Sequence, residues 1–437
     1  MVRKFLPTVN RRQVLKAMAA AAGCALLPAE MAFAAEPWKA TKEDEAFLDD
    51  LERYGSRFFW EQASPKTGQI LDRARNNLTG GRDPRRMASI ASTGFGLTAL
   101  CIAHHRGYLP HAHVVERVRT TLDWHLNSMP EVHGFFYHFT DIETGERFRG
   151  SELSSIDTAI LLCGILTARA YFDDPQIQHL AQQIYERVDW PWMLNGGKSF
   201  SMGWHPETGF LANRWDHYCE LMMIDLLAIG SPTHPVAPSY WNNFTRSVLT
   251  YGDYSYISGD DPLFTQQYSQ AWFDFRNKRD EYADYFTNSV IATQAHKAFC
   301  LAHPKWYSED YWGVTSSDYV GGYTAWGGPP AIGPLDGTVV PSAAAGSLAF
   351  LPADCVSVLR AMRSKWGKRA WGRFGFVDAF HPAANWYDPD VLGIDQGISV
   401  LMAENLRSGL VWNTFMRNQA PVLALQRAGF HGDGLEG

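Results

Sequence analysis

Apolar residues recur at spacings of three and four along most of the chain, which is the period of an α-helix with a buried face. This spacing predicts about twelve helices separated by short polar or glycine-containing stretches. We expect these helices at 41–62, 88–106, 110–128, 151–172, 174–190, 213–229, 238–249, 279–302, 341–350, 352–369, 393–406 and 409–426.

The predicted helices are of two kinds. Those at 151–172 and 213–229 are apolar on most faces, whereas those at 41–62, 110–128 and 174–190 have one apolar stripe and a charged face. Alternation of buried and amphipathic helices indicates two concentric rings, the all-α (α/α)6 toroid, in a single domain. The alternation does not close between about 287 and 345, where a long loop rich in Gly, Trp and Tyr lies, and loops of that length usually carry function.

The first 34 residues have the pattern of an export signal. Five basic residues precede or enter an apolar segment from Val14 to Leu27, and Ala-Phe-Ala follows at 32–34. The motif "NRRQVLK" places Arg11 and Arg12 directly before the apolar segment, as a twin-arginine signal does. We therefore expect residues 1–34 to be a signal peptide, residues 35–437 to be the mature domain, and the protein to be periplasmic or secreted.

Composition narrows the possible partners. Without residues 1–34 the chain has 34 basic and 45 acidic residues, a net charge of −11, which gives no attraction to nucleic acid or anionic lipid. No later apolar stretch has membrane length, so we expect no membrane contact after signal removal. We also expect the protein to be a monomer. Five cysteines remain, an odd number, and we expect no disulfide framework.

The stretch "NRWDHYCELMMIDLLAIG" (213–230) begins with charged residues and continues as an almost uninterrupted apolar run. Buried charge is unfavourable unless the fold holds it in place. In a toroid the N-terminal ends of the inner helices converge on one cavity, where such groups could lie. The helices at 151–172 and 393–406 also begin with acidic residues, Glu152 and Asp157 in the first and Asp395 in the second.

The loops before these helices have the composition of a sugar site. They read "FFYHFTDIETGERFRG" (135–150), "KSFSMGWHPETGFLA" (198–212) and "YWGVTSSDYVGGYTAWGGPPAIGPLDG" (311–337). Aromatic faces stack on the C–H surface of a sugar ring, and carboxylates or amides bind its hydroxyls. Three such loops beside three acid-bearing helix starts predict a carbohydrate groove.

Long motifs in order along the chain carry a family resemblance. They include "GSELSSIDTAILLCGIL", "FSMGWHPETGFLANRWDHYCELMMIDLLAIGSPTHPV", "YWGVTSSDYVGGYTAWGGPP", "DGTVVPSAAAGSLAF" and "LGIDQGISVLMAENLRSGLVW". The chain resembles the bacterial glycoamylase-like proteins, the group that includes endo-β-1,2-glucanases, from "ILDRAR" near Asp72 to the last helices. The resemblance implies hydrolysis of β-1,2-glucan with inversion, in an (α/α)6 barrel. The sequence carries no metal-site signal, and we expect no metal and no cofactor.

Inversion needs a protonated carboxyl at the glycosidic oxygen and a carboxylate that activates water on the other face of the sugar. We expect Glu220 to be the acid, since seven residues into a buried helix its pKa should be raised. A structural Glu220 paired with Arg214 or His217 is the alternative. Glu152, Asp141 and Glu143 are candidate bases, with Asp157, Asp318 and Asp395 as further candidates. The glucose units would be held by Asp72, Arg73, Asp157, Trp204, Arg214, His217, Trp312, Asp318, Trp326 and Asp395.

Other enzyme classes lack their motifs in this sequence. It contains no His-Glu-x-x-His zinc motif and no Gly-x-Ser-x-Gly nucleophile turn. "YDPDVLGID" could hold calcium, but Asp-Pro-Asp is more typical of a turn. Exo-acting or transglycosylating enzymes on β-1,2-glucan or another glucan, a polysaccharide lyase and a non-catalytic periplasmic glucan-binding protein remain alternatives.

Overall fold

The computed structural model describes residues 38–260, 262–326 and 335–435. The predicted signal peptide, residues 1–34, lies outside these residues. Residues 40–437 form one compact unit that is mostly helical. Its α-helices are α2 (Lys42–Glu61), α3 (Ile90–His105), α4 (His111–Asn127), α5 (Ser155–Tyr171), α6 (Pro175–Glu186), α7 (Trp190–Leu194), α8 (Met222–Ile229), α9 (Tyr268–Trp272), α10 (Tyr285–Leu301), α11 (Pro341–Ala345), α12 (Pro352–Trp366), α13 (Gly393–Arg407), α14 (Leu410–Phe415) and α15 (Gln419–Arg427).

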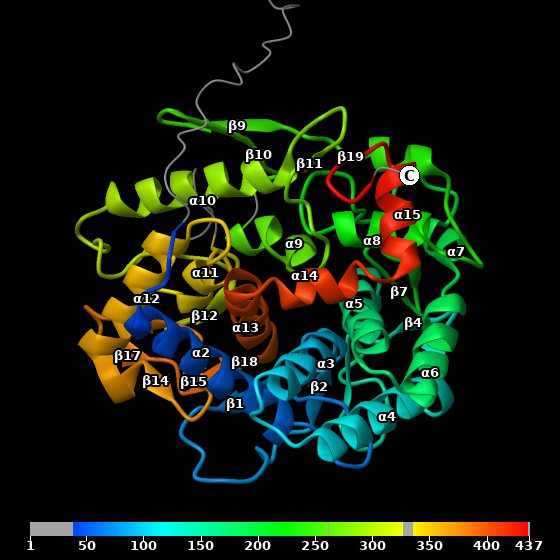
Figure 1. Cartoon of the computed structure of the whole chain (residues 1–437), viewed down its shortest axis with the longest axis horizontal. Helices are drawn as coiled ribbons and strands as arrows, with labels where there is room; N and C mark the ends of the chain where they lie inside the picture. The colour runs from blue at the N-terminus through cyan, green and yellow to red at the C-terminus, as the bar shows by residue number, and fades with distance from the viewer. Residues whose placement is uncertain (1–37, 261, 327–334, 436–437) are drawn as a thin grey trace, which may run out of the picture. The chain divides into compact units, whose positions relative to one another are not determined.

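The two kinds of helix predicted from the sequence are present. In α3, 14 of 16 residues are buried, and all eight residues of α8 are buried, so neither helix has a solvent face. Helices α2, α4 and α6 instead bury one stripe and expose the rest. Figure 1 shows α2, α4, α6, α10 and α12 at the periphery and α3, α5, α9 and α13 further inside. Burial on all sides explains why α3 and α8 carry almost no charge along their length.

The inner helices α3 and α5 pack at very short range. A Cβ atom on Gly94 would lie 2.4 Å from the Ile160 carbonyl oxygen, and one on Gly164 would lie 2.0 Å from the Gly94 carbonyl oxygen. Only glycine allows two backbones to approach this closely. These two glycines therefore fix the crossing of α3 over α5.

The C-terminal ends of α3 and α13 are joined by buried ion pairs. Arg106 donates from Nε and Nη2 to Glu404 at 2.7 and 2.8 Å, and its Nε lies 3.5 Å from Glu52. Arg407 also pairs with Glu52. Both glutamates are fully buried, and burial, reinforced by the charge of Glu404, raises the pKa of Glu52 to about 8.

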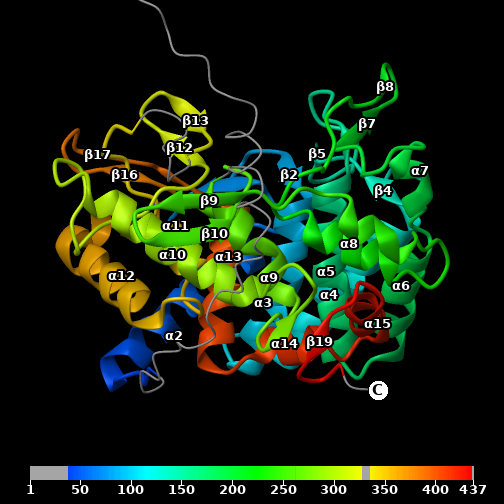
Figure 2. The same ribbon diagram turned by 90° about the horizontal axis from the view of Figure 1, so that it is seen from above.

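Short strands connect the helices. They are β1 (Arg73–Arg75), β2 (Met87–Ser89), β3 (Glu131–Val132), β4 (Phe135–Phe136), β5 (Phe139–Asp141), β6 (Leu153–Ser154), β7 (Gly203–His205), β8 (Gly209–Phe210), β9 (Val248–Tyr251), β10 (Tyr254–Ile257), β11 (Lys278–Arg279), β12 (Ser317–Tyr319), β13 (Gly322–Thr324), β14 (Trp371–Gly372), β15 (Gly375–Phe376), β16 (Phe380–His381), β17 (Trp386–Tyr387), β18 (Asp390–Leu392) and β19 (His431–Gly432). They pair antiparallel, β1 with β18, β2 with β5, and β6 with β7. Figure 2 shows β2, β5, β7, β8, β12, β13, β16 and β17 at one end of the helices, with α14 and β19 at the other.

Several predicted helix boundaries were wrong. The helix expected at 213–229 begins only at Met222, and the one expected at 238–249 is a 3-10 turn (Pro238–Asn242) followed by β9. The segment expected at 409–426 divides into α14 and α15. In each case the backbone hydrogen bonds go to distant residues or to a turn rather than to the preceding helical turn.

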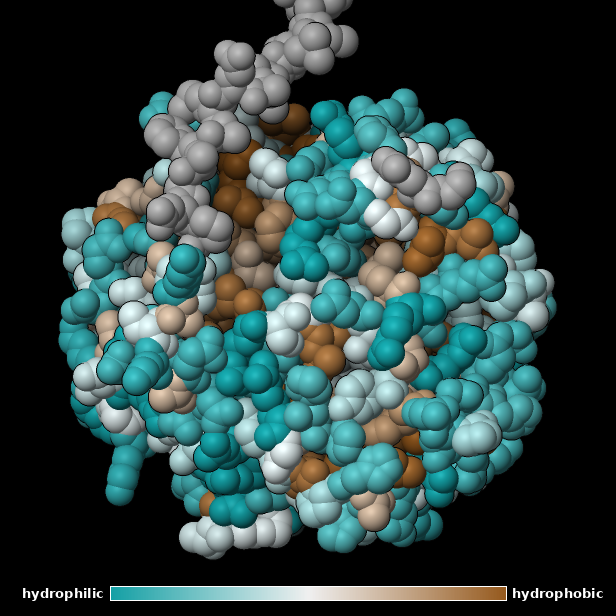
Figure 3. All heavy atoms as spheres, viewed as in Figure 1, coloured by the Kyte–Doolittle hydropathy of each residue, from teal (hydrophilic) through white to brown (hydrophobic). Residues whose placement is uncertain are grey.

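The face seen in Figure 3 is mostly hydrophilic, with a hydrophobic patch near the β9–β10 hairpin and α10. Beneath the surface, the buried residues Tyr256 of β10 and Ala292 and Ala295 of α10 pack together. None of the helices in the described ranges combines the length and apolar composition needed to cross a membrane. The cysteines in these ranges are all buried: Cys101, Cys163, Cys219, Cys300 and Cys355.

Candidate active site

Three inner helices begin directly from short strands at the end of the molecule where the strands gather. β2 leads into α3, β6 into α5 and β18 into α13. The first amide N–H of α3, α5 and α13 donates to the carbonyl oxygen of His138, Met202 and Asp72 respectively, over 2.7 to 3.3 Å. Each helix start is thereby tied to a loop from another part of the chain, and that loop delivers its side chains to the helix start.

The third residue of each of these helices is polar: Ser92 in α3, Asp157 in α5 and Asp395 in α13. The hydroxyl of Ser154 donates to Asp157, and the hydroxyl of Ser342 donates to Asp395 at 3.0 Å. A carboxylate in the first helical turn is also favoured by the helix dipole. Two of the sequence-predicted acids are therefore held at helix starts by specific hydroxyl donors.

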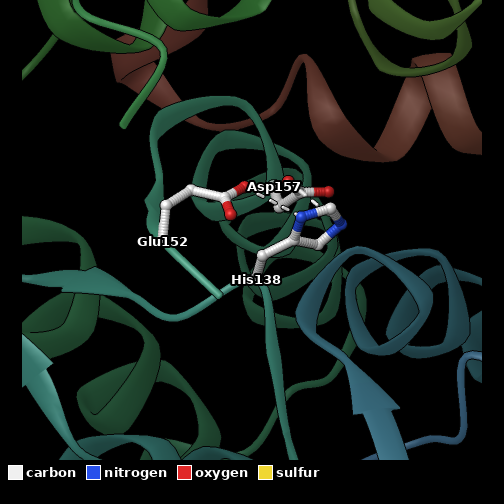
Figure 4. A group of neighbouring side chains, drawn as sticks. All are labelled: His138, Glu152 and Asp157. Carbon is white, nitrogen blue, oxygen red and sulfur yellow. Dashed lines mark hydrogen bonds and ion pairs between the residues drawn. The ribbon is translucent and has the colours of Figure 1, made fainter. Parts of the chain in front are cut away.

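His138 lies between two carboxylates (Figure 4). Its Nδ1 is 3.0 Å from Glu152 Oε1, and its Nε2 is 3.6 Å from Asp157 Oδ2. Burial disfavours the imidazolium, but the charge of Asp157 and the hydrogen bond and charge of Glu152 outweigh it and raise the pKa of His138 to about 9. The hydrogen bond from His138 in turn lowers the pKa of Glu152. At neutral pH this group is an imidazolium between two carboxylates.

Arg73 forms a second charged group. Its Nε donates to Asp72 at 3.0 Å and its Nη1 donates to Asp318 at 2.6 Å. Burial opposes the charged guanidinium, but Asp72 and Asp318 outweigh it, and the pKa of Arg73 is raised. The charge of Asp72 also contributes to the raised pKa of His138, so the two groups act on one another.

The hydroxyl of Tyr268 shows that the predicted acids share one region. Burial raises its pKa first, and the negative charges of Asp395, Glu220 and Asp157 raise it further. Coulomb interactions weaken with distance, so these charges act on the hydroxyl from nearby, and the neighbouring Ser269 donates a hydrogen bond to the Glu220 carbonyl oxygen. They come from the starts of α13, α8 and α5, which therefore converge on one site.

Further carboxyl groups lie beside Asp395. Burial raises the pKa of Asp395 to about 6, and burial together with the charge of Asp395 raises that of Asp378 well above its ordinary value. Burial also raises the pKa of Asp388 to about 8. The site thus holds more carboxyl groups than positive charges.

Two groups of described side chains place metal-ligating atoms within 4.8 Å of one another. One is His138, Glu152 and Asp157, in which the imidazolium already lies between the carboxylates. The other is Asp318, Asp378 and Asp388, which offers only oxygen atoms.

The position of Glu220 differs from the predicted one. It lies in the turn before α8, two residues ahead of Met222, and not seven residues inside a helix. Its side chain is buried, with 8% of the residue exposed, and its carbonyl oxygen accepts a hydrogen bond from Ser269. The raised pKa expected for Glu220 remains a prediction.

Two of the candidate bases lie in ion pairs outside this region. Asp141 accepts two hydrogen bonds from Arg86 at 2.6 Å, and these bonds hold its pKa at about 2. Glu143 pairs with Arg82 and accepts a hydrogen bond from Ser64. The contacts of both carboxylates organise the turn after β5, so the structure does not bring them to the Tyr268 site.

The three tryptophans predicted to stack on sugar differ in their exposure. Trp204 lies in β7, half-buried, with its ring 5.7 Å from that of Trp192. Trp312 is fully buried, so its expected stacking on sugar is corrected to a core role. Trp326 is 1% exposed and packs edge-on against Tyr319, and it likewise offers no open face.

Arg214 and His217 precede α8. Arg214 Nη1 donates to the carbonyl oxygens of Leu194 and Ser199, so the guanidinium holds the turn after α7 rather than facing the acids. His217 is more exposed, and its Nδ1 lies 3.1 Å from Asp216. Arg214 thus supports this loop, and its contact with substrate stays a prediction.

The sequence analysis missed His138, Tyr268, Asp378 and Asp388. His138 stands in one of the predicted sugar loops, but its partners are 14 and 19 positions further along the chain. Tyr268 lies in α9, a five-residue helix too short to give a periodic signal. Asp388 belongs to the "YDPD" segment that composition alone assigns to a turn.

Comparisons with known proteins identify chains that are similar to this one. The family model described as "Putative glucoamylase" matches residues 212–419. The chain is 28% identical over 431 residues to an exo β-1,2-glucooligosaccharide sophorohydrolase (non-reducing end) of Parabacteroides distasonis, with 88% of this chain and 58% of the relative covered. The chain thus spans little more than half the length of that relative.

Solved structures match along almost the whole chain. A "putative glucoamylase" from Bacteroides uniformis superposes with a TM-score of 0.83 at 27% identity, covering 91% of this chain and 100% of that one. An endo-β-1,2-glucanase from Chitinophaga pinensis, in complex with sophorotriose and glucose, has a TM-score of 0.81 at 26% identity, covering 89% and 99%.

Proposed function

The chain belongs to the glycoamylase family, related to β-1,2-glucanases and a sophorohydrolase, and on this premise we propose that it is an inverting glycoside hydrolase of β-1,2-glucan. The observation that carries the proposal is that Glu220, Asp157 and Asp395 are buried at or beside the starts of α8, α5 and α13, near the buried Tyr268, whose neighbour Ser269 donates to the Glu220 carbonyl oxygen. Carboxyl groups from separate elements can act on opposite faces of one glycosidic bond, as inversion requires. We further propose that the buried and amphipathic helices form the two rings of an (α/α)6 toroid, with this site at one end.

We assign Glu220 as the general acid and Asp395 as the general base. Glu220 is buried in a turn, and Asp395 is held by the Ser342 hydroxyl at the start of α13, so each has a fixed position. Asp395 is preferred to Asp141, which is engaged by arginine, and to Glu152, which is engaged by the His138 imidazolium.

The remaining polar groups are suited to hold glucose units. Asp72, Arg73 and Asp318 form a connected row of acceptors and donors, and Asp157 lies near the acids. Bidentate or bridging contacts of this kind orient sugar hydroxyls, and the half-buried ring of Trp204 can stack on a ring face. These residues would position the chain across the acid and the base.

The first experiment incubates the purified protein with linear β-1,2-glucan and follows the products by chromatography over time. Mixed oligosaccharides at early times indicate endo cleavage, which we expect from the similarity to the Chitinophaga enzyme. A single disaccharide product would favour the second candidate, exo action, as in the sophorohydrolase relative. Absence of any product, with glucan binding retained, would refute the hydrolase assignment.

The acid is tested with Glu220→Gln, which keeps the shape and removes the proton donor. We expect hydrolysis to fall by roughly 10²–10⁴-fold while glucan binding is retained. Glu143→Gln is the matched control, because Glu143 is a carboxylate of the same kind engaged with Arg82 and Ser64. Normal turnover by Glu220→Gln, or an equal loss in the control, would contradict the assignment.

We also propose that the protein acts in the periplasm or outside the cell. The support is the sequence pattern of residues 1–34, with its paired arginines and apolar segment. Fractionation of a producing cell, with replacement of Arg11 and Arg12 by lysine, tests the location. Cytoplasmic retention of the wild-type chain would overturn this proposal.

A further inference from the structure

The carboxylates of Asp318, Asp378 and Asp388 each have one oxygen that accepts a hydrogen bond. The Asp318 amide donates to Asp378 Oδ2 at 2.7 Å, and the Asp390 amide donates to Asp388 Oδ1 at 3.0 Å. Arg73 Nη1 donates to Asp318 Oδ2 at 2.6 Å. These donors fix the orientation of the three carboxylate planes.

The other oxygens of the buried pair have no hydrogen-bond donor among the described residues. Within that part of the chain, Asp378 Oδ1 and Asp388 Oδ2 are buried without a hydrogen-bond partner, and the two residues are only 2% and 4% exposed. Next to Asp378, the buried Oδ2 of Asp395 also lacks a donor. Ionised carboxylates that are buried without a partner are strongly unfavourable, so either a cation or shared protons must neutralise this cluster.

The geometry fits a single cation. One oxygen from each of Asp318, Asp378 and Asp388 lies within 4.8 Å of the others. Calcium binds oxygen at about 2.3–2.6 Å, so oxygens on opposite sides of one ion are about 4.6–5.2 Å apart. All three ligands are carboxylates, without nitrogen or sulfur, which disfavours zinc and suits a hard cation.

We propose that Asp318, Asp378 and Asp388 bind a calcium ion, at a site that lies beside the proposed base Asp395 but does not use it as a ligand. Calcium is preferred to magnesium because the ligands come from three irregular segments, β12, the loop between β15 and β16, and the turn before β18, and calcium tolerates irregular geometry. The backbone amides and Arg73 act as the outer shell that orients the ligands. The ion links the loops of residues 378–388 to the strand that carries Asp318, and through Asp318 it fixes Arg73.

The alternative is that the carboxyl groups share protons, and the test separates the two. The whole protein is treated with EDTA, dialysed and titrated with CaCl₂ by calorimetry at neutral pH, with MgCl₂ as the comparison. We expect one calcium ion per chain, and a rise in Tm on the order of 3 °C at a calcium concentration 100 times the Kd. The readout is binding and does not depend on hydrolysis.

Variants locate the ion. Asp378→Asn and Asp388→Asn should each weaken calcium binding at least about tenfold and reduce the rise in Tm. Asp390→Asn is the matched control in the same turn, because the Asp390 side chain pairs with Arg85 and lies outside the three ligands. It should bind calcium as the wild type does.

Two results would overturn the proposal. One is absence of calcium binding by the EDTA-treated wild type up to about 10 mM, far above the range of specific sites, which would assign shared protons to the cluster. The other is wild-type affinity in both Asp378→Asn and Asp388→Asn. The wild-type titration decides the first point even where a variant fails to fold.

Discussion

Replacing His138 with glutamine should remove a pH-dependent part of the stability. Burial works against the imidazolium, but Asp157 and Glu152 raise the pKa of His138 from 6.5 to about 9. A difference of this size corresponds to about 3 kcal/mol, at about 1.4 kcal/mol per pH unit. Because the folded-state pKa is the higher one, this stabilisation is complete below pH 6.5 and is lost as the pH rises through about 9.

The assay is urea unfolding of the wild type and His138→Gln at about pH 6, 8 and 10. The difference in the free energy of unfolding should be largest at the lowest pH and should fall by about 3 kcal/mol across the series. His133→Gln is the matched control, since His133 Nδ1 lies 3.1 Å from Asp189 with 45% of its side chain exposed, compared with 29% for His138. A pH-independent difference for His138→Gln, or the same pH dependence in the control, would refute the reasoning.

Three further variants test the packing and the ion pairs. Gly164→Ala should lower the urea midpoint, because its Cβ would lie 2.0 Å from the Gly94 carbonyl oxygen and separating the helices costs about 1–3 kcal/mol. Arg106→Met should lower the free energy of unfolding by about 3–5 kcal/mol, because it removes the bidentate partner of the fully buried Glu404. Asp141→Asn should lower the Tm at about pH 5 but not near pH 2, because hydrogen bonds from arginine hold the pKa of Asp141 at about 2 and their stabilisation is lost as the pH falls through that value.

Matched changes elsewhere should have little effect. Gly80→Ala adds a Cβ with no atom within 4 Å, so its urea midpoint should match the wild type. Arg53→Met breaks a surface pair with Asp49 in which the arginine side chain is 49% exposed, and such pairs contribute at most about 1 kcal/mol. If Gly80→Ala and Arg53→Met lost as much stability as Gly164→Ala and Arg106→Met, the proposed roles of the α3–α5 contact and of the Arg106 ion pair would be wrong. An equal loss of Tm at both pH values would contradict the Asp141 argument.

The sequence predicted the helices whose pattern is set by burial. Helices α2, α3 and α4 were placed to within about two residues at each end, because a continuous apolar stripe or an apolar core segment specifies them locally. The sequence pattern predicted a helix wrongly for residues 213–221. The amphipathic pattern continues there, but the backbone amides donate hydrogen bonds to residues distant in the sequence. The Trp215 amide donates to Phe200 and the Tyr218 amide to Thr245, partners that no local pattern reveals.

The candidate site was predictable in part for the same reason. Asp157 and Asp395 follow recognisable helix starts, so their place at the inner end of buried helices could be inferred. The role of His138 could not be inferred, because it depends on two carboxylates, Glu152 and Asp157, that contact His138 only in the folded chain. Trp312 was placed wrongly because a tryptophan in a glycine-rich loop has the same local sequence whether its ring is open or buried.

The hydrogen bonds that tie the first amides of α3, α5 and α13 to His138, Met202 and Asp72 have a consequence for how the protein can vary. Each bond uses a backbone carbonyl, so it places no demand on the side chain at that position. The helical framework can therefore stay unchanged while the sequences and lengths of the loops between these three positions change. New substrate preferences could arise at this end of the molecule by exchange of loops, without repacking of the core.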